Sequence, residues 1–158
     1  AECRVSDEIG AFWRVVQFLV SEGEIIEDGD FKIRVLARFH SDRFKDIHWN
    51  EPRKVLYLQK TRIFMLYKQN CHKIGDKILP EETLKYYLEN SKCFLGEQRM
   101  TYHVFKKGVQ VIDYEHHNGV NEPIKKSVQQ RSYCFDYQLL AETFEINLEL
   151  GNTETPEE

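Results

Sequence analysis

The chain has 158 residues, which is enough for one domain with a full hydrophobic core and too few for two ordinary ones. Hydrophobic residues make up 41% of it and charged residues 30%, a balance typical of globular proteins. No apolar run approaches the length of about 18 residues that a membrane helix needs, and no secretory signal opens the chain. We therefore expect a cytoplasmic protein with reduced cysteines and no membrane partner. Because the chain begins with Ala1 rather than Met, a piece of a longer protein is favoured over a processed one.

The net charge of −4 conceals an uneven distribution of charge along the chain. Residues 1–51 carry 7 Lys/Arg against 11 Asp/Glu, and residues 108–158 carry 3 against 10. Residues 52–107 reverse the balance with 12 against 5, and residues 52–75 hold six basic side chains and no acidic one. A basic middle in an acidic chain indicates an anionic partner, although a solvated basic face without any partner explains the same pattern.

The first predicted element is a helix that starts at Ser6, a favourable N-cap, and ends at Gly23. Its apolar residues recur at the spacing of one helix face and are Ile9, Phe12, Trp13, Val16, Leu19 and Val20. Residues 31–39 alternate apolar and basic side chains, as a half-buried strand does. We expect residues 41–54 to form a polar loop, whereas residues 54–59 fit either a strand or the start of a helix.

A pair of helices is predicted next. The apolar face of the first helix consists of Phe64, Tyr67, Cys71 and Ile74, and Gly75 ends it. After a turn over residues 76–80, Glu81 and Glu82 suit the N-terminus of the second helix. That helix is expected to turn Leu84, Tyr87 and Leu88 toward the core. The outward face is expected to hold Thr83, Lys85, Tyr86, Glu89 and Asn90.

The last third of the chain is predicted to be mostly strand and turn. Gly96 marks the exit from the second helix, and residues 99–108 alternate as a strand. Residues 109–131 are expected to form a long polar turn, although residues 109–114 can extend the strand. A returning strand is predicted over residues 132–140, with Tyr133, Phe135 and Tyr137 on one face. A short helical turn within residues 138–150 completes a single domain of residues 1–150, and residues 151–158 form an acidic, disordered tail.

Two helices followed by a β-hairpin are typical of the winged-helix arrangement. In that arrangement the second helix enters the major groove of DNA, and the hairpin, called the wing, lies along the backbone or the minor groove. We therefore predict an α+β fold with a winged-helix-like core, which is a helix-turn-helix plus a β-hairpin, and with an extra N-terminal helix and strand. The hairpin, over residues 106–131, is longer than an ordinary wing.

Two stretches carry a resemblance to known proteins. The segment "RIFMLYKQNCHKIGDKILPEETLKYYLENSKCFLG", with the basic hairpin and "SYCFDYQLL" after it, resembles the C-terminal winged-helix domain of plasmid, phage and poxvirus-type primase-helicases. The segment "AFWRVVQFLVSEGEIIEDGDFKI" is similar to C-terminal regions of replication or mobilisation proteins from Bacteroides mobile elements. The resemblance spans about residues 9–149. It implies DNA binding in the service of a helicase or primase motor.

The motor itself has to be a partner, because the chain contains no G-x-x-x-x-G-K-[ST] phosphate-binding loop. We therefore predict a non-catalytic accessory domain without a cofactor. Lys and Arg neutralise phosphates, while Tyr and Asn add backbone or base contacts. The candidate nucleic-acid-binding residues are Arg62, Lys68, Lys73, Lys77, Lys85, Tyr86, Asn90, Lys92, Arg99, Lys106, Lys107, Lys125, Lys126 and Arg131. Of these, Lys85 and Asn90 are the candidates for reading base edges.

Three other interpretations stay open. Glu81, Glu82 and Glu89 would repel phosphate, so the helix pair can instead dock a replication or mobilisation protein. A metal-dependent nuclease could use the cluster Asp113, Glu115, His116 and His117, although we expect this stretch to be a loop. The third is a zinc site formed by Cys71, His72, Cys93 and Cys134. Cysteines in such positions are more commonly small residues of the core.

Overall fold

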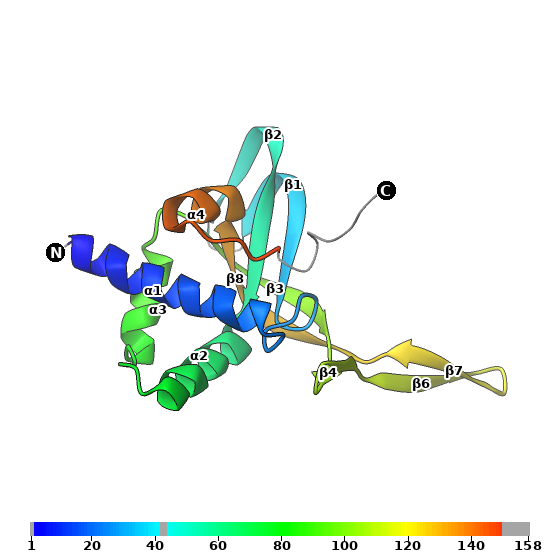
Figure 1. Ribbon diagram of the computed structural model, residues 1–158. Coiled ribbons are helices and arrows are strands. Elements are labelled where there is room, and N and C mark those ends of the chain that lie inside the picture. The colour runs from blue at the N-terminus through cyan, green and yellow to red at the C-terminus, as the bar shows by residue number, and fades with distance from the viewer. Residues whose placement is uncertain (1, 42–43, 150–158) are drawn as a thin grey trace, which may run out of the picture.

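The computed structural model describes residues 2–41 and 44–149, with side chains described over residues 7–40 and 46–149. In these residues the fold is mixed α+β, as predicted, with four helices and one curled antiparallel sheet (Figure 1). The tail predicted over residues 151–158, and the domain boundary at residue 150, lie outside the described residues.

Helix α1 (Glu2–Ser21) carries the predicted core stripe but starts earlier than predicted. Residues 2–5 contain neither Gly nor Pro, so the helix continues back to Glu2, and the prediction of Ser6 as its N-cap is wrong. Five apolar side chains of the stripe are at most 3% exposed: Ile9, Phe12, Trp13, Val16 and Leu19. Gly23 follows the helix with a positive φ of 77°, a conformation that glycine adopts without strain.

Strands β1 (Phe31–Ser41) and β2 (Phe44–Gln59) form a long antiparallel hairpin. The loop predicted over residues 41–54 is therefore wrong for residues 44–54, which belong to β2, and residues 54–59 are strand rather than helix. Half-buried Ile47 and Trp49 alternate in β2 with exposed Asp46, His48 and Asn50. This period of two is the signature of a strand, but it lies in a stretch whose overall composition is polar.

The sheet has the order β1-β2-β8-β3 and is antiparallel throughout (Figure 1). Strand β3 covers Phe94–His103, and strand β8 covers Ser127–Asp136. The two edge strands curl toward each other. The side-chain amide of Gln98 in β3 donates to the carbonyl oxygen of His40 in β1, and the His103 N–H donates to the Asp28 carbonyl at 2.8 Å.

Each face of the curled sheet has its own hydrophobic cluster. The main cluster packs the sheet against the helices and centres on edge-to-face rings such as Trp13 and Phe135, whose centroids are 5.0 Å apart. The smaller cluster lies on the other face and includes Phe39, Tyr57 and Cys134. Cys134 and Phe135 are neighbours in β8, so the alternation of a strand sends one to each cluster.

Helices α2 (Lys60–Ile74) and α3 (Glu81–Glu89) form the predicted pair. Phe64, Tyr67 and Cys71 are buried in α2, and Gly75 ends that helix with a φ of 72°. In α3, Leu84 and Leu88 are buried and Tyr87 packs at the edge of the main cluster. Ile74, the fourth residue of the predicted apolar face, is 60% exposed and does not pack in the core. It is the last residue of α2, where the chain turns away from the rest of the core.

The strand predicted over residues 99–108 and the turn predicted over residues 109–131 are both wrong in their bounds. After β3, strands β4 (Phe105–Lys106) and β5 (Val109–Gln110) form a small hairpin. Strands β6 (Ile112–His117) and β7 (Val120–Lys125) then form a longer hairpin, the β-ribbon, which extends away from the body of the protein (Figure 1). Its turn, Asn118–Gly119, has positive φ at both residues, as a type I′ turn requires.

Residues 132–140, predicted as one strand, divide between β8 and helix α4 (Tyr137–Phe144). Asp136 is the N-cap of α4, and its carboxylate accepts the Leu139 N–H at 3.2 Å. The same carboxylate accepts two hydrogen bonds of 3.0 Å from the Arg53 guanidinium. Tyr133, Phe135 and Tyr137 nonetheless all join the main cluster, as predicted, and the helical turn predicted here is α4.

Candidate nucleic-acid interface

The basic groove is a hollow of about 600 Å³ where α2, the start of α3 and strand β8 meet. Four of its lining side chains are Lys or Arg, and only one is acidic. The lining residues are Lys60, Thr61, Phe64, Met65, Lys68, Gln69, His72, Glu81, Lys85 and Arg131.

Helix α2 supplies the long wall of the groove. Lys60, Phe64, Lys68 and His72 are spaced by four residues, so they follow one another along a single side of the helix. Phe64 is 7% exposed and belongs to the main cluster, which fixes this side of α2 against the body of the protein. Lys68 and His72 are exposed, and Lys68 makes no ion pair with any residue that the structure describes.

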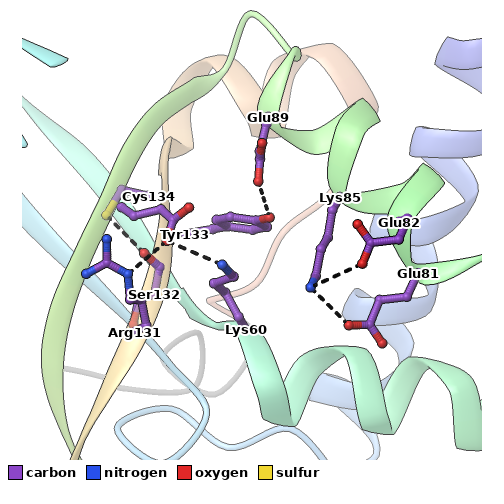
Figure 2. A network of polar contacts seen from close by, with 10 residues as sticks. Lys60, Glu81, Glu82, Lys85, Glu89, Arg131, Ser132, Tyr133 and Cys134 are labelled. Atoms are coloured by element: carbon purple, nitrogen blue, oxygen red, sulfur yellow. Dashed lines mark hydrogen bonds and ion pairs between the residues drawn. The ribbon is translucent and has the colours of Figure 1, made fainter. Parts of the chain in front are cut away.

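Helix α3 contributes Lys85, which points toward α2 (Figure 2). Its ammonium lies 3.1 Å from a carboxylate oxygen of Glu81 and 3.8 Å from one of Glu82, and 5.7 Å from the centre of the Phe64 ring. The hydrogen bond to Glu81 raises the pKa of Lys85, which keeps this side chain charged. The pairing also satisfies much of its charge, so Lys85 contributes less to anion binding than an unpaired lysine.

Strand β8 contributes Arg131, which shares a carboxylate with Lys60. The Arg131 Nε donates to Glu97 Oε1 at 3.1 Å, and the Lys60 ammonium lies 3.3 Å from the same oxygen. The Lys60 ammonium also lies 4.6 Å from the centre of the Tyr133 ring (Figure 2). One carboxylate facing two cations leaves the floor of the groove positive.

Tyr133 is part of the same polar network but is not a titrating group near neutral pH. Its hydroxyl donates to Glu89 Oε2 at 2.6 Å (Figure 2). Burial, and then the hydrogen bond to the Glu89 carboxylate, raise the pKa of this hydroxyl. Tyr133 therefore holds β8 against α3 and orients Lys60, and it carries no chemistry of its own.

The structure brings together only some of the predicted residues. Lys68, Lys85 and Arg131 line the groove, and Arg99 lies directly opposite Arg131 across the β3–β8 pair. Exposed Lys73 and Lys77 lie near the far end of α2 and in the turn after it.

Two predicted residues at the helix pair have other partners. The Arg62 Nε donates to Asp30 Oδ1 at 2.9 Å, so this arginine ties α2 to the segment before β1. The Asn90 side-chain amide donates to the Tyr86 carbonyl at 2.8 Å and closes the end of α3. Tyr86 itself is 64% exposed, and Lys92 is exposed on the turn toward β3.

The remaining predicted residues lie at the base of the β-ribbon. Lys106 and Lys107 are in the β4–β5 hairpin. Exposed Lys125 ends β7, and exposed Lys126 joins β7 to β8. Lys107 and Arg62 also line a second hollow of about 560 Å³ between the 23–30 segment, α2 and the ribbon base. Asp30, which pairs with Arg62, also lines this second hollow. The second hollow is therefore less positive than the basic groove.

Lys60 and His72 are the groove residues that sequence reasoning missed. The available signal was the spacing of four from Lys60 through Phe64 and Lys68 to His72, which places all four on one side of a helix.

The geometry does not support the two metal interpretations. Within the described residues, no group of three or more His, Cys, Asp or Glu side chains is placed to hold a metal ion. The stretch 113–117 is strand β6 rather than the predicted loop, so His116 faces away from Asp113, Glu115 and His117.

The proposed zinc ligands are also separated. Cys71 and Cys93 are in the main cluster, but Cys134 is in the cluster on the other face of the sheet. Burial raises the pKa of all three thiols, which keeps them protonated and unreactive.

Comparison with protein-family models, with curated proteins and with solved structures gave no match. None of the helices in the described part of the chain combines the length and the apolar character that crossing a membrane requires.

Proposed function

We propose that this protein binds DNA through the basic groove, as a non-catalytic accessory domain of a mobile-element replication or transfer protein. The observation that carries the proposal is the convergence of Lys60, Lys68 and Arg131 from two elements on one hollow with a single acidic lining residue. Such a hollow attracts phosphates, and each phosphate that it neutralises releases counterions.

The order of the elements supports a winged-helix-like core for this role. The helix pair connects β2 to β3, and β8 returns to lie between these two strands. The β-ribbon occupies the place of the wing. Helix α1 and strand β1 are then the additional N-terminal helix and strand.

The surface of α3 indicates how the DNA lies. Glu82 and Glu89 are exposed on α3, Asn90 is folded back on the helix, and Lys85 is paired with Glu81. A helix with these charges is poorly suited to entering the major groove. The binding free energy therefore comes mainly from phosphate contacts along α2 and β8, and the sequence preference is modest.

The likeness to the C-terminal domains of primase-helicases is part of the same proposal. A helicase or primase motor, supplied by another domain or another chain, would act on the DNA that this domain holds. A cytoplasmic location is consistent with that role.

Fluorescence anisotropy with labelled single-stranded and duplex DNA tests the groove. The double variant Lys68→Gln/Arg131→Gln removes two groove cations, and Arg14→Gln/Arg38→Gln removes two exposed cations from α1 and β1. Both variants change the net charge equally, so the total charge cannot explain a difference between them. We expect binding to weaken about tenfold or more in the first and less than about twofold in the second.

The salt dependence is the second readout. Three phosphate contacts predict that affinity falls about twentyfold to fortyfold between 50 and 200 mM salt. Equal effects of the two double variants, or no binding at 50 mM salt, would contradict the proposal.

A docking site for a replication or mobilisation protein is the second candidate. The observation that favours it is the presence of Met65, Ile74 and Tyr86, which are 39%, 60% and 64% exposed on the outer surface of the helix pair. An apolar contact of this kind depends weakly on salt, whereas phosphate binding depends on it strongly. Retention of a partner at 200 mM salt by the Lys68→Gln/Arg131→Gln variant would favour this function.

A further inference from the structure

The β-ribbon is joined to the β3–β8 pair by backbone hydrogen bonds at Lys126. Lys126 is the single residue between β7 and β8. Its N–H donates to the Val111 carbonyl at 2.9 Å, and its carbonyl accepts the Val104 N–H at 2.9 Å. The strand from residue 120 to residue 136 therefore alternates its side chains between the same two faces along its whole length.

These two faces differ in charge. One face, which we call the acid-free face, begins at the Arg99–Arg131 pair and continues through the pairs Ile112–Lys125 and Tyr114–Pro123. From Arg131 outward it carries no carboxylate. The three carboxylates of the ribbon, Asp113, Glu115 and Glu122, all belong to the opposite face.

Side-chain contacts agree with this assignment. On the acid-free face, His116 Nδ1 lies 2.8 Å from the side-chain oxygen of its cross-strand partner Asn121. On the opposite face, His117 Nε2 lies 3.1 Å from Glu115 Oε1. The segregation of charge is therefore a property of the folded ribbon, because it depends on the register that places Glu122 opposite Glu115.

The inner end of the acid-free face holds two arginines directly opposite each other. Like charges directly opposite each other disfavour the pairing of two strands, and an anion bound between the two arginines would offset this repulsion. Arg131 uses its Nε for Glu97, which leaves its terminal nitrogens to donate elsewhere. Arg99 is exposed and makes no hydrogen bond or ion pair with the described residues. Together they offer two guanidinium groups to one anion.

The outer part of the face holds an aromatic ring without a packing partner in the core. Tyr114 is 69% exposed and lies across from Pro123. Cationic side chains interleaved with an exposed aromatic ring are the features that hold a single nucleic-acid strand, with phosphates on the cations and a base stacked on the ring.

We propose that the acid-free face binds a single-stranded nucleic acid that runs from the basic groove along the β-ribbon. Phosphates lie against Arg99, Arg131 and Lys125, and a base stacks on Tyr114. The inference rests on the proposed function, because Arg131 belongs to both the groove and this face. The ten residue-to-residue steps from Arg131 to Asn121 span about 33 Å of strand, and the twist of the sheet winds the face gradually around the ribbon.

Lys125 and Lys126 provide a matched pair for the test. They are adjacent and both exposed, but alternation places Lys125 on the acid-free face and Lys126 on the opposite one. The probe is a labelled 20-nucleotide oligo(dT). We expect Lys125→Gln to weaken binding about threefold at 150 mM salt and to lower the slope of log affinity against log salt by about 0.7. Lys126→Gln should change both values less than Lys125→Gln does, because the Lys126 side chain lies on the opposite face.

Tyr114 provides an independent test of stacking. We expect Tyr114→Ala to weaken binding to oligo(dT) about tenfold and Tyr114→Phe to retain it. Ile124→Ala, on the opposite face of the ribbon, is the matched control and should have no effect. None of these residues belongs to either hydrophobic cluster, so the variants should unfold at the same urea concentration as the parent.

The outcomes separate this inference from the groove. Equal effects of Lys125→Gln and Lys126→Gln, or no effect of Tyr114→Ala, would overturn the acid-free face, while weakening by Lys68→Gln/Arg131→Gln would still support the groove. If the unsubstituted protein binds duplex DNA but no oligo(dT), the acid-free face is overturned and the groove is not. If it binds acidic peptides but neither oligo(dT) nor duplex DNA, both proposals fail.

Discussion

Arg62 illustrates how a buried partner changes the role of a basic side chain. The Asp30 carboxylate is 6% exposed and accepts hydrogen bonds of 2.9 Å from the Arg62 Nε and from the Ile26 N–H. A buried carboxylate without its cation is costly, so this arginine has a structural role as well as any contact with phosphate. Its partner lies 32 residues away in the chain, and the sequence gives no sign of the pairing.

We therefore expect Arg62 and Lys68 to separate stability from binding. Arg62→Gln should lower the free energy of unfolding by about 1–3 kcal/mol, because Asp30 loses its charged donor. Lys68→Gln, on the same helix but without an ion pair in the described residues, should change it by less than about 0.5 kcal/mol. Urea unfolding measures both values, and equal stability of the two variants would contradict the structural role of Arg62.

Two buried tyrosines predict a loss of stability in alkali. Burial raises the pKa of the Tyr57 and Tyr67 hydroxyls from 10 to about 12. The unfolded chain therefore loses these protons at a lower pH than the folded protein, so their stabilisation is complete below pH 10 and is lost as the pH rises toward 12. At pH 11, the raised pKa of each of these two tyrosines lowers the free energy of unfolding by about 1.4 kcal/mol.

Urea unfolding at pH 8 and pH 11 measures this loss. Tyr57→Phe should reduce the difference between the two pH values by about 1.4 kcal/mol. Tyr114→Phe, at an exposed position of the β-ribbon, controls for the removal of a phenol and should leave the difference unchanged. An unchanged difference in Tyr57→Phe would show that Tyr57 ionises equally in the two states.

At the scale of the elements, the β-ribbon depends on its turn. A two-stranded hairpin is marginally stable in water, and all twelve residues of β6 and β7 are exposed. Gly119 has a φ of 81°, which other residues adopt only at a cost of about 1 kcal/mol or more. We expect Gly119→Ala to speed amide hydrogen exchange across residues 112–125 without changing the global free energy of unfolding.

Asn118→Gly is the matched control for the turn. Asn118 also has a positive φ, of 50°, so glycine fits there without strain. The ribbon amides should keep their protection in this variant. Equal exchange in Gly119→Ala and Asn118→Gly would mean that the turn does not determine the stability of the ribbon.

The sequence predicted the elements whose apolar residues have a clear period. Helix α1 and the pair α2–α3 were found from spacings of three and four, and β1 from alternation. The outer part of β2 and most of the β-ribbon were predicted as loop or turn, with strand over residues 109–114 left open, because their polar composition outweighed two local signals. These signals were the alternation of Ile47 and Trp49 with polar residues, and the Asn118–Gly119 pair, which favours a hairpin.

The sequence predicted the types of residue that form the candidate site, but it identified only some of the residues that line it. Lys68, Lys85 and Arg131 were expected to bind phosphate, and they do line one hollow. Lys60 and Arg131 share the Glu97 carboxylate, although Lys60 lies 37 positions and Arg131 lies 34 positions from Glu97 in the chain. The sequence could not predict this contact, because it depends on the pairing of β3 with β8.

At the scale of the whole molecule, the two hydrophobic clusters share their central strands. Val55 and Tyr57 in β2 face the smaller cluster, while Leu56 and Leu58 in the same strand face the main one. Unfolding of these shared strands would expose the side chains of both clusters to water. The fold should therefore behave as one cooperative unit, which is what a single domain requires.

The two tryptophans allow this cooperativity to be measured. Trp13 is buried in the main cluster, and Trp49 packs at the edge of the smaller one. Because the chain has two Trp, Trp13→Phe leaves Trp49 as the only reporter, and Trp49→Phe leaves Trp13. In each variant, urea unfolding followed by Trp fluorescence should coincide with unfolding followed by far-ultraviolet circular dichroism. Comparing the two signals within one variant removes the effect of the substitution on stability. If Trp49 fluorescence changes at a lower urea concentration than the dichroism of the same variant, the β1–β2 hairpin and the smaller cluster unfold separately, and the single cooperative domain is wrong.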